Sequence, residues 1–149
     1  MKQKLMRAHV WLLAGLTPLL VKVMPLKWLL GLLTPPGRFR PYRGLGADQI
    51  VEAVRRRLAA PKNMRRRACL REALMLFHFL RLAGEPAVMH FSVYAPGDDS
   101  RMHAHCWVTV GDRAVSSPPG DPHATMLTRG EGLGSPRRRQ EGATGRPCQ

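Results

Sequence analysis

The chain has 149 residues, enough for one compact domain with extensions, and 44% of them are hydrophobic. Lysine and arginine number 24 against 10 acidic residues, and the formal charge of +14 indicates an anionic partner such as an acidic peptide or a membrane surface. Nucleic-acid binding is not expected, because only 6% of the residues are aromatic and no recognition motif accompanies the charge.

The N-terminal region is basic at its start and then strongly apolar. Residues 10–21 carry no charge, but they are fewer than the roughly 20 apolar residues that cross a bilayer. Because Pro18 and Pro25 should each interrupt a helix, the pattern predicts two short apolar helices. We expect them to pack on the main domain. The alternatives are a weak contact of residues 10–33 with a membrane surface and a cleaved signal peptide.

A linker rich in proline, glycine and arginine follows at residues 34–46. Asp48 then has the position of a helix N-cap. Beside three arginines, four apolar residues recur at helical spacing: Ile50, Val51, Val54 and Leu58. Pro61 follows this segment. The pattern predicts an amphipathic helix that begins at Asp48 and ends before Pro61.

A longer helix is predicted from Cys69 to Ala83. Six apolar residues cover a wide face, as in a central helix of a domain: Leu70, Ala73, Leu74, Phe77, Leu80 and Leu82. A narrower polar stripe should consist of Arg71, Glu72, Met75, His78 and Arg81. Gly84 suits the helix C-terminus, and Pro86 prevents the helix from continuing.

Strand patterns replace helical ones after Pro86. Alternating residues predict strands over 87–94 and 104–110, and a tight turn at Gly111 and Asp112 leads into a short strand over 113–116. The short connections make this sheet antiparallel. Beyond Ser117 the signal fades, and residues 129–149 have the composition of a disordered basic tail. The expected organisation is therefore apolar helices and linker at 1–46, an α+β core at 47–128 and the tail at 129–149.

Cys69 and His105 are the candidate catalytic pair. Cys69 begins the central helix, where unpaired N–H groups and neighbouring arginines favour a thiolate and could bind an oxyanion. His105 lies in a strand and could exchange the proton of a cysteine nucleophile. The alternative for Cys69 is a buried structural cysteine. With only three cysteines, the chain has no disulfide framework, which indicates a reducing cytoplasm.

A metal site is the weaker alternative for the histidine-rich strand. His103 and His105 could bind a metal ion together with His90 or Cys106. However, no further ligand pair has a recognisable zinc spacing. We therefore expect neither a metal ion nor a cofactor.

The order of these features resembles a known family. A cysteine at a helix start followed by a β-hairpin with His-x-Trp is the layout of the papain-like transglutaminase fold. More narrowly, Cys-Leu-Arg-Glu-Ala-Leu at 69–74, Gly-Glu-Pro-Ala at 84–87 and Ala-His-Cys-Trp-Val at 104–108 resemble the leader peptidase part of the lasso peptide B protein. The likeness covers about residues 5–117. It implies an α+β core in which the cysteine helix packs on a small antiparallel sheet.

The chain departs from the family pattern at two positions. Cys106 stands where the family has alanine, and strand alternation points it away from His105 and into the core. The acidic third residue of the family lies about twelve positions past the histidine, where this chain has serine. For the acceptor that fixes the Nδ1–H of His105, we rank Ser117 first by hairpin register, Asp121 second and Asp112 last.

The resemblance implies a cytoplasmic cysteine protease that removes the leader from a ribosomally made lasso peptide precursor. It also implies the peptidase-only form, whose partners are the precursor peptide, a separate leader-recognition protein and a lasso cyclase. The rival hypothesis is a non-catalytic transglutaminase-like module that holds an acidic peptide or a membrane surface. The missing acid at Ser117 and the charge of +14 favour that rival.

Overall fold

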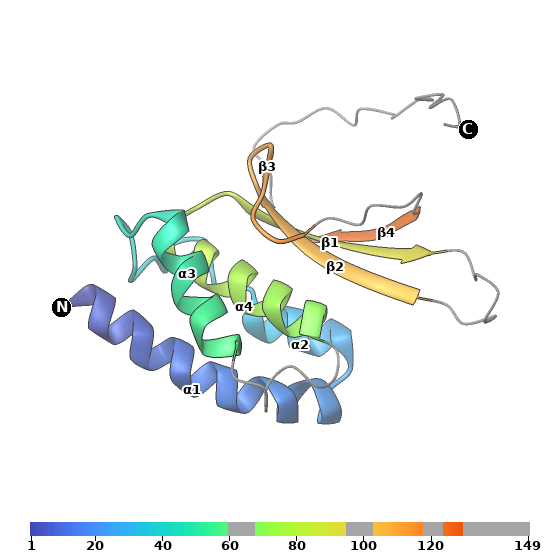
Figure 1. Ribbon diagram of the computed structural model, residues 1–149, viewed down its shortest axis with the longest axis horizontal. Coiled ribbons are helices and arrows are strands. Elements are labelled where there is room, and N and C mark those ends of the chain that lie inside the picture. Colours follow the sequence, from blue (N-terminus) through green and yellow to red (C-terminus); the bar gives the residue numbers. More distant parts are fainter. Residues whose placement is uncertain (60–67, 95–102, 118–123, 130–149) are drawn as a thin grey trace.

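The computed structural model describes residues 1–59, 68–94, 103–117 and 124–129. Within them, a layer of helices packs against an antiparallel sheet, which confirms the predicted α+β class (Figure 1). The strands are ordered β3-β2-β1-β4 across the sheet. The elements are α1 (Lys2–Val23), α2 (Leu26–Leu33), α3 (Ala47–Leu58), α4 (Ala68–Ala83), β1 (Ala87–Tyr94), β2 (His103–Val110), β3 (Arg113–Ala114) and β4 (Ala124–Arg129).

Helix α4 lies between the sheet and the other helices, and it contacts β1 and β2 as well as α1, α2 and α3. The predicted polar stripe is therefore wrong at Met75, which is fully buried, and at His78, whose Nδ1–H donates to the carbonyl of Leu33 at 2.8 Å. Thr17 of α1 reaches the sulfur of Met75 at 3.6 Å. At Met75 and His78, the stripe that looked polar in the sequence therefore faces α1 and α2.

The N-terminal helices pack on the main domain, as expected. Met6, Val10 and Val21 of α1 belong to the same hydrophobic core as α3, α4 and the sheet. The prediction that Pro18 breaks the helix is wrong, because α1 continues through it to Val23. Burial on both sides of Pro18, at Thr17 and Val21, offsets the lost backbone hydrogen bond. Pro25 does separate α1 from α2.

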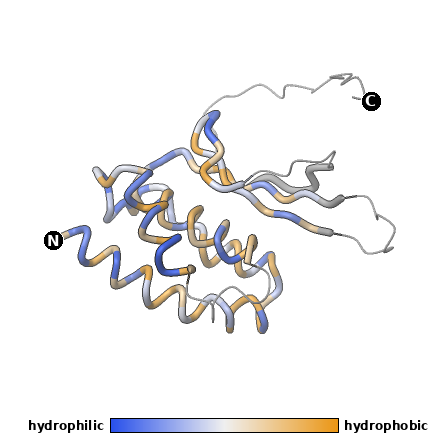
Figure 2. Tube along the Cα trace, in the orientation of Figure 1, coloured by the Kyte–Doolittle hydropathy of each residue, from blue (hydrophilic) through white to orange (hydrophobic). Residues whose placement is uncertain are grey.

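Helix α1 is also long and apolar enough to cross a membrane by length and composition. Only 28% of the most apolar 18-residue stretch of α1 is buried within the protein, because the buried residues of this helix line a single side. Figure 2 shows hydrophobic residues on successive turns of α1 and through α2. The opposite side of α1 therefore presents apolar side chains to solvent.

Helix α3 begins one residue earlier than predicted. Gly46 is its N-cap and no side chain caps it, so the prediction of Asp48 as the cap is wrong. Asp48 lies in the first turn, where a carboxylate suits the helix dipole, and its Oδ1 accepts from Arg113 at 2.9 Å. This ion pair joins the start of α3 to the β2–β3 hairpin.

The sheet confirms the predicted antiparallel pairing of β1 with β2, in which Ser92 lies opposite His105. Val110 pairs with Arg113 across the Gly111-Asp112 turn, as the hairpin register predicted. Two expectations fail: β3 ends at Ala114 rather than at residue 116, and β4, for which no strand was predicted, pairs with β1. Apart from Arg129, which ends β4, the predicted tail lies outside the described residues.

Helix α4 ends as predicted, at Gly84. This glycine has φ of +90°, and the N–H groups of Gly84 and Glu85 donate to the carbonyls of Arg81 and Leu80 at 3.0 Å each. That pair of bonds is a Schellman motif, which needs the left-handed conformation. A Cβ at Gly84 would also lie 3.0 Å from Cδ of Arg40.

Gly84→Ala should therefore destabilise the protein by about 1–2 kcal/mol, the cost of a left-handed non-glycine residue. Gly15→Ala is the matched control, because Gly15 is an exposed residue inside α1 with no atom near its Cβ position. The control should stabilise the protein by roughly 0.5–1 kcal/mol. Urea denaturation measures both variants, and equal effects of the same sign would contradict this account.

Candidate active site

Cys69 is the second residue of α4, and its side chain is half-buried. Because α4 packs against β1 and β2, its N-terminal end lies next to the sheet. The Cys69 side chain neighbours Cys106 of β2, whose S–H donates a hydrogen bond to the sulfur of Cys69. The sequence predicted that Cys106 packs in the core, and only 7% of it is exposed, but nothing in the sequence indicated its contact with Cys69.

Several donors favour the thiolate form of Cys69. The hydrogen bond from the Cys106 thiol is the largest influence and lowers the pKa of Cys69 to about 5, although burial opposes it. The backbone N–H groups of Cys106 and Leu70 and the positive charge of His105 act in the same direction. Burial and the neighbouring Cys69 raise the pKa of Cys106. Of the two thiols, Cys69 is therefore the one whose thiolate form is favoured.

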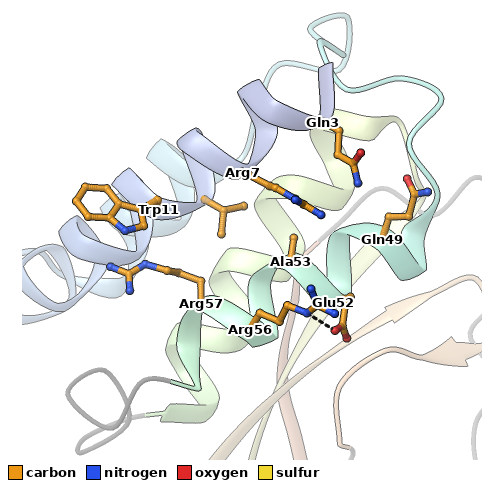
Figure 3. A pocket seen from close by; sticks show the side chains of 9 residues that line it. Gln3, Arg7, Trp11, Gln49, Glu52, Ala53, Arg56 and Arg57 are labelled. Atoms are coloured by element: carbon orange, nitrogen blue, oxygen red, sulfur yellow. Dashed lines mark hydrogen bonds and ion pairs between the residues drawn. The ribbon is translucent and has the colours of Figure 1, made fainter. Parts of the chain in front are cut away.

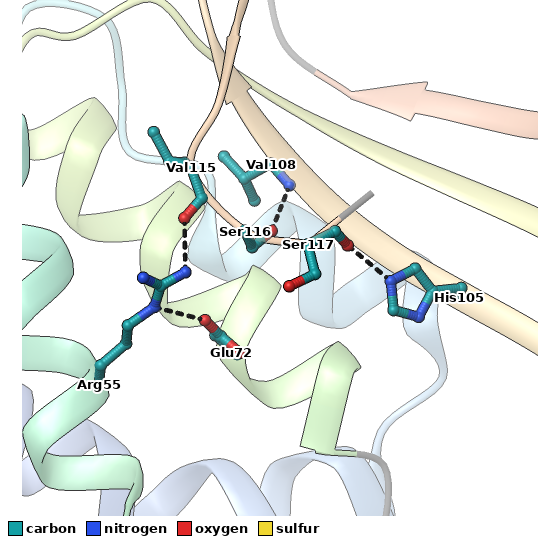
Figure 4. A network of polar contacts seen from close by, with 7 residues as sticks. All are labelled: Arg55, Glu72, His105, Val108, Val115, Ser116 and Ser117. Atoms are coloured by element: carbon teal, nitrogen blue, oxygen red, sulfur yellow. Dashed lines mark hydrogen bonds and ion pairs between the residues drawn. The ribbon is translucent and has the colours of Figure 1, made fainter. Parts of the chain in front are cut away.

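His105 lies on β2 next to Cys106, and its ring projects from the strand toward Ser117 (Figure 4). Nε2–H donates to the main-chain carbonyl oxygen of Ser117 at 2.8 Å. Since a carbonyl only accepts, this bond fixes the proton on Nε2 and leaves Nδ1 free to exchange a proton with a nucleophile. The sequence argument assigned the oriented proton to Nδ1, and the structure corrects that assignment to Nε2.

The contact of Ser117 with His105 is thus made by its backbone and not by its side chain. Its hydroxyl points away from the His105 ring (Figure 4). Asp112 is exposed in the hairpin turn, where Val110 pairs with Arg113, so it lies at the far end of the hairpin from His105. Asp121, the second-ranked candidate, lies outside the described residues. Among the described candidates, only Ser117 contacts His105.

Three polar contacts fix the segment that carries this carbonyl (Figure 4). The Oγ of Ser116 accepts from the backbone N–H of Val108 at 2.8 Å. Arg55 of α3 donates to the carbonyl of Val115 at 2.9 Å and pairs with Glu72 of α4 at 3.1 Å. Sequence reasoning missed both contacts of Arg55, because they join residues that are 17 and 60 positions apart in the chain.

No hydrogen bond joins Cys69 to His105 in the part of the chain that is described. The charge of His105 nevertheless acts on Cys69, and β2 has no β3 partner beyond Thr109, so the edge beside His105 is not covered by β3. Catalytic hydrogen bonds are often long without substrate and shorten when it binds. The two groups are thus within electrostatic reach of each other.

His90, a second histidine of the sheet, contacts residues of β2. Nε2 of His90 lies 3.0 Å from Oγ1 of Thr109, and its ring stacks on Trp107 with centroids 5.0 Å apart. Within residues 1–59, 68–94, 103–117 and 124–129, no group of three or more potential ligands could hold a metal ion.

A hollow of about 430 Å³ lies between α1 and α3, and its lining includes neither Cys69 nor His105 (Figure 3). Arg7, Arg56 and Arg57 line it together with Trp11, and Glu52 binds Arg56 at 2.6 Å. This basic surface is separate from the cysteine–histidine pair.

The family model of the Transglutaminase-like superfamily matches residues 13–127, which extend from the first half of α1 into β4 and contain Cys69 and His105. The search of curated proteins and the search of solved structures each found no match.

The Cys69 thiolate can be tested by alkylation with iodoacetamide in a Cys148→Ser background. With a pKa of about 5, Cys69 is already ionised at pH 7, so its rate should hardly change between pH 7 and pH 8. An ordinary thiol with a pKa of about 8.5 would react roughly eightfold faster at the higher pH. Mass spectrometry of the labelled peptides measures the rate at each site.

Two variants of Cys106 test whether its thiol is what lowers the pKa of Cys69. Cys106→Ala removes the donor, so the pKa of Cys69 should rise and the gain in rate between pH 7 and pH 8 should appear. Cys106→Ser keeps a donor and should preserve the flat profile. A profile that is the same in all three proteins would contradict the role of the Cys106 thiol.

Proposed function

This chain belongs to the transglutaminase-like superfamily, and from that premise we propose that it is a cysteine peptidase that removes the leader from a lasso peptide precursor. Many members of this superfamily are hydrolases that use cysteine and histidine. The observation that carries the peptidase assignment is the half-buried Cys69 at a helix start, ionised beside Cys106 and within the electrostatic reach of an oriented His105.

In this mechanism the Cys69 thiolate attacks the scissile carbonyl carbon. The carbonyl oxygen becomes an oxyanion, and the N–H groups at the start of α4 are placed to stabilise it. His105 in its imidazolium form then gives its proton to the leaving amine, and the C–N bond breaks. Neutral His105 next removes a proton from water, which attacks the thioester and releases the leader as a carboxylic acid.

The substrate assignment rests on the residues that resemble the lasso peptide leader peptidase. Those residues are the Cys-Leu-x-x-Ala-Leu helix start, the Gly-x-Pro-Ala turn and the Ala-His-x-Trp-Val strand, which lie in α4, after α4 and in β2. Through that resemblance we propose a separate leader-recognition protein and a lasso cyclase as partners, and a cytoplasmic location.

The second candidate function is a non-catalytic module that binds an acidic peptide. Two observations favour it: no carboxylate faces His105 among the described residues, and arginines line the hollow between α1 and α3 (Figure 3). A thiol-reactive peptide probe distinguishes the two functions. Labelling of Cys69 in preference to Cys106 and Cys148 supports the peptidase.

We expect Cys69→Ala and His105→Ala each to abolish leader removal while leaving the fold intact. The two residues act as a unit, so the double variant should be hardly slower than either single variant. Mass spectrometry of a precursor incubated with its leader-recognition protein measures cleavage, and circular dichroism checks folding. Cys148→Ser is the control, because it removes a thiol other than Cys69 and Cys106 and should still cleave. Cleavage by a folded Cys69→Ala protein would exclude the mechanism.

Two substitutions of Ser117 distinguish the role of its backbone carbonyl from the role of its side chain. Ser117→Ala keeps the carbonyl that accepts from His105, so the cleavage rate should stay within about twofold of the starting protein. Ser117→Asp should change the rate by less than about tenfold, or about 1.4 kcal/mol, because the side chain at this position points away from the His105 ring. Kinetics on purified proteins measure both, and a large loss in Ser117→Ala would show that the hydroxyl is required.

A further inference from the structure

The outer side of α1 and α2 is an exposed apolar surface. Its side chains are between 39% and 70% exposed, although all of them are large and hydrophobic. We call this surface the outer apolar face, and it consists of Leu5, Leu12, Leu16, Leu19, Val23, Leu26, Trp28 and Leu32. A contiguous apolar surface of this kind marks an interaction site, whereas single exposed apolar residues do not.

Helix geometry places this face opposite the core. On α1 its members are spaced by seven, four, three and four residues, which keeps them on one side of a helix with 3.6 residues per turn. The buried residues of α1 occupy the other side, where they meet α3 and α4. Figure 1 shows α1 on the side of the helical layer that is remote from the sheet. The face therefore points away from the rest of the fold.

The charges around this face are all positive. No aspartate or glutamate occurs before Asp48, so no carboxylate of the N-terminal helices can repel an anionic surface. Lys22 and Lys27 are exposed at the end of α1 and the start of α2, beside the apolar side chains. The remaining cations of this region are Lys2, Lys4, Arg7, Arg38, Arg40 and Arg43. Its charge thus complements anionic lipid headgroups.

A hollow beside α2 combines apolar side chains with a positive charge. It measures about 470 Å³ and is lined by Met24, Lys27, Trp28, Gly31 and Leu32. Trp28, with 69% of its surface exposed, has the amphipathic ring that favours the boundary between headgroups and acyl chains. Lys27 stands beside it and can reach a phosphate while its methylene stem lies along apolar surface.

We propose that the outer apolar face docks the protein on an anionic bilayer surface, with α1 and α2 lying in the interface rather than crossing it. A crossing orientation would remove Met6, Val10 and Val21 from the core that they share with α3 and α4. An interfacial helix needs only one apolar side with cations at its border. This docking is independent of Cys69 and His105.

The first experiment is sedimentation of the full chain with two kinds of vesicle. Vesicles of phosphatidylcholine mixed with phosphatidylglycerol should bind at least tenfold more protein than vesicles of phosphatidylcholine alone, and added salt should weaken the binding. Lys27→Glu should reduce binding by more than the roughly fivefold contribution of one lysine, because it also introduces repulsion. Arg113→Glu is the matched control, since it makes the same change of charge on the β2–β3 hairpin, remote from the face.

Tryptophan fluorescence tests the orientation. Trp28 belongs to the face, whereas Trp11 lies on the α3 side of α1, where the Arg57 guanidinium is 5.1 Å from its ring centroid (Figure 3). Trp107 is buried in the sheet and provides the background. Brominated lipid should quench the starting protein and Trp11→Phe, and it should lose most of its effect on Trp28→Phe.

A combined Leu16→Ser and Leu19→Ser variant should lose vesicle binding while keeping its helical circular dichroism, because both side chains are exposed. Cys69→Ala should bind vesicles like the starting protein, so loss of peptidase activity and loss of docking are separable. Equal binding to neutral and anionic vesicles, or no binding to either, would overturn the proposal. A dimer in lipid-free solution that the Leu16 and Leu19 substitutions convert to monomer would assign the face to a second copy instead.

Discussion

The burial of α4 on all of its sides is the constraint on which the site depends. Large side chains around its whole circumference are fully buried, among them Leu74, Met75, Phe77 and Phe79. Each is worth about 1.5–3 kcal/mol relative to an exposed position, so the helix cannot rotate or slide without exposing some of them. The position of Cys69 is fixed in the same way, because this residue lies in the first turn of α4. Its position against Cys106 is therefore a consequence of core packing.

At this site, neutral groups orient the histidine and favour the thiolate, whereas a carboxylate commonly orients the histidine in such pairs. The Ser117 carbonyl orients His105 and fixes its tautomer, but a carbonyl brings no full charge to stabilise an imidazolium. The Cys106 thiol partly compensates at the other end of the pair, because it lowers the pKa of Cys69 more than the charge of His105 does. Cys106, a departure from the family pattern, thereby becomes part of the electrostatics of the nucleophile.

The N-terminal helices have two apolar sides with different roles. The inner side completes the core around α4, and the outer side remains open to solvent next to Lys22 and Lys27. Because α1 and α2 lie on the far side of α4 from the sheet, an anionic surface could approach them without covering His105 or the segment that ends at Ser117 (Figure 1). Docking and peptide cleavage are thus compatible in one small protein.

The sequence alone determined the class of fold, the break at Pro25, the end of α4 at Gly84, the antiparallel pairing of β1 with β2 and the register of the β2–β3 hairpin. These features follow from local periodicity and from backbone conformations that only glycine or proline favours. The hairpin also led us to expect Ser117 near His105, but β3 pairing ends at Ala114 and the contact is made by the main-chain carbonyl of Ser117.

Tertiary structure decided what local rules cannot describe. Packing of α1 against α4 carried the helix through Pro18 and buried Met75, and pairing with β1 formed β4 from a segment for which no strand was predicted. The contacts of Cys106 with Cys69 and of Arg55 with Val115 join residues separated by 37 and 60 positions. Such contacts depend on how the elements pack in three dimensions, and a pattern read along one segment contains no information about them.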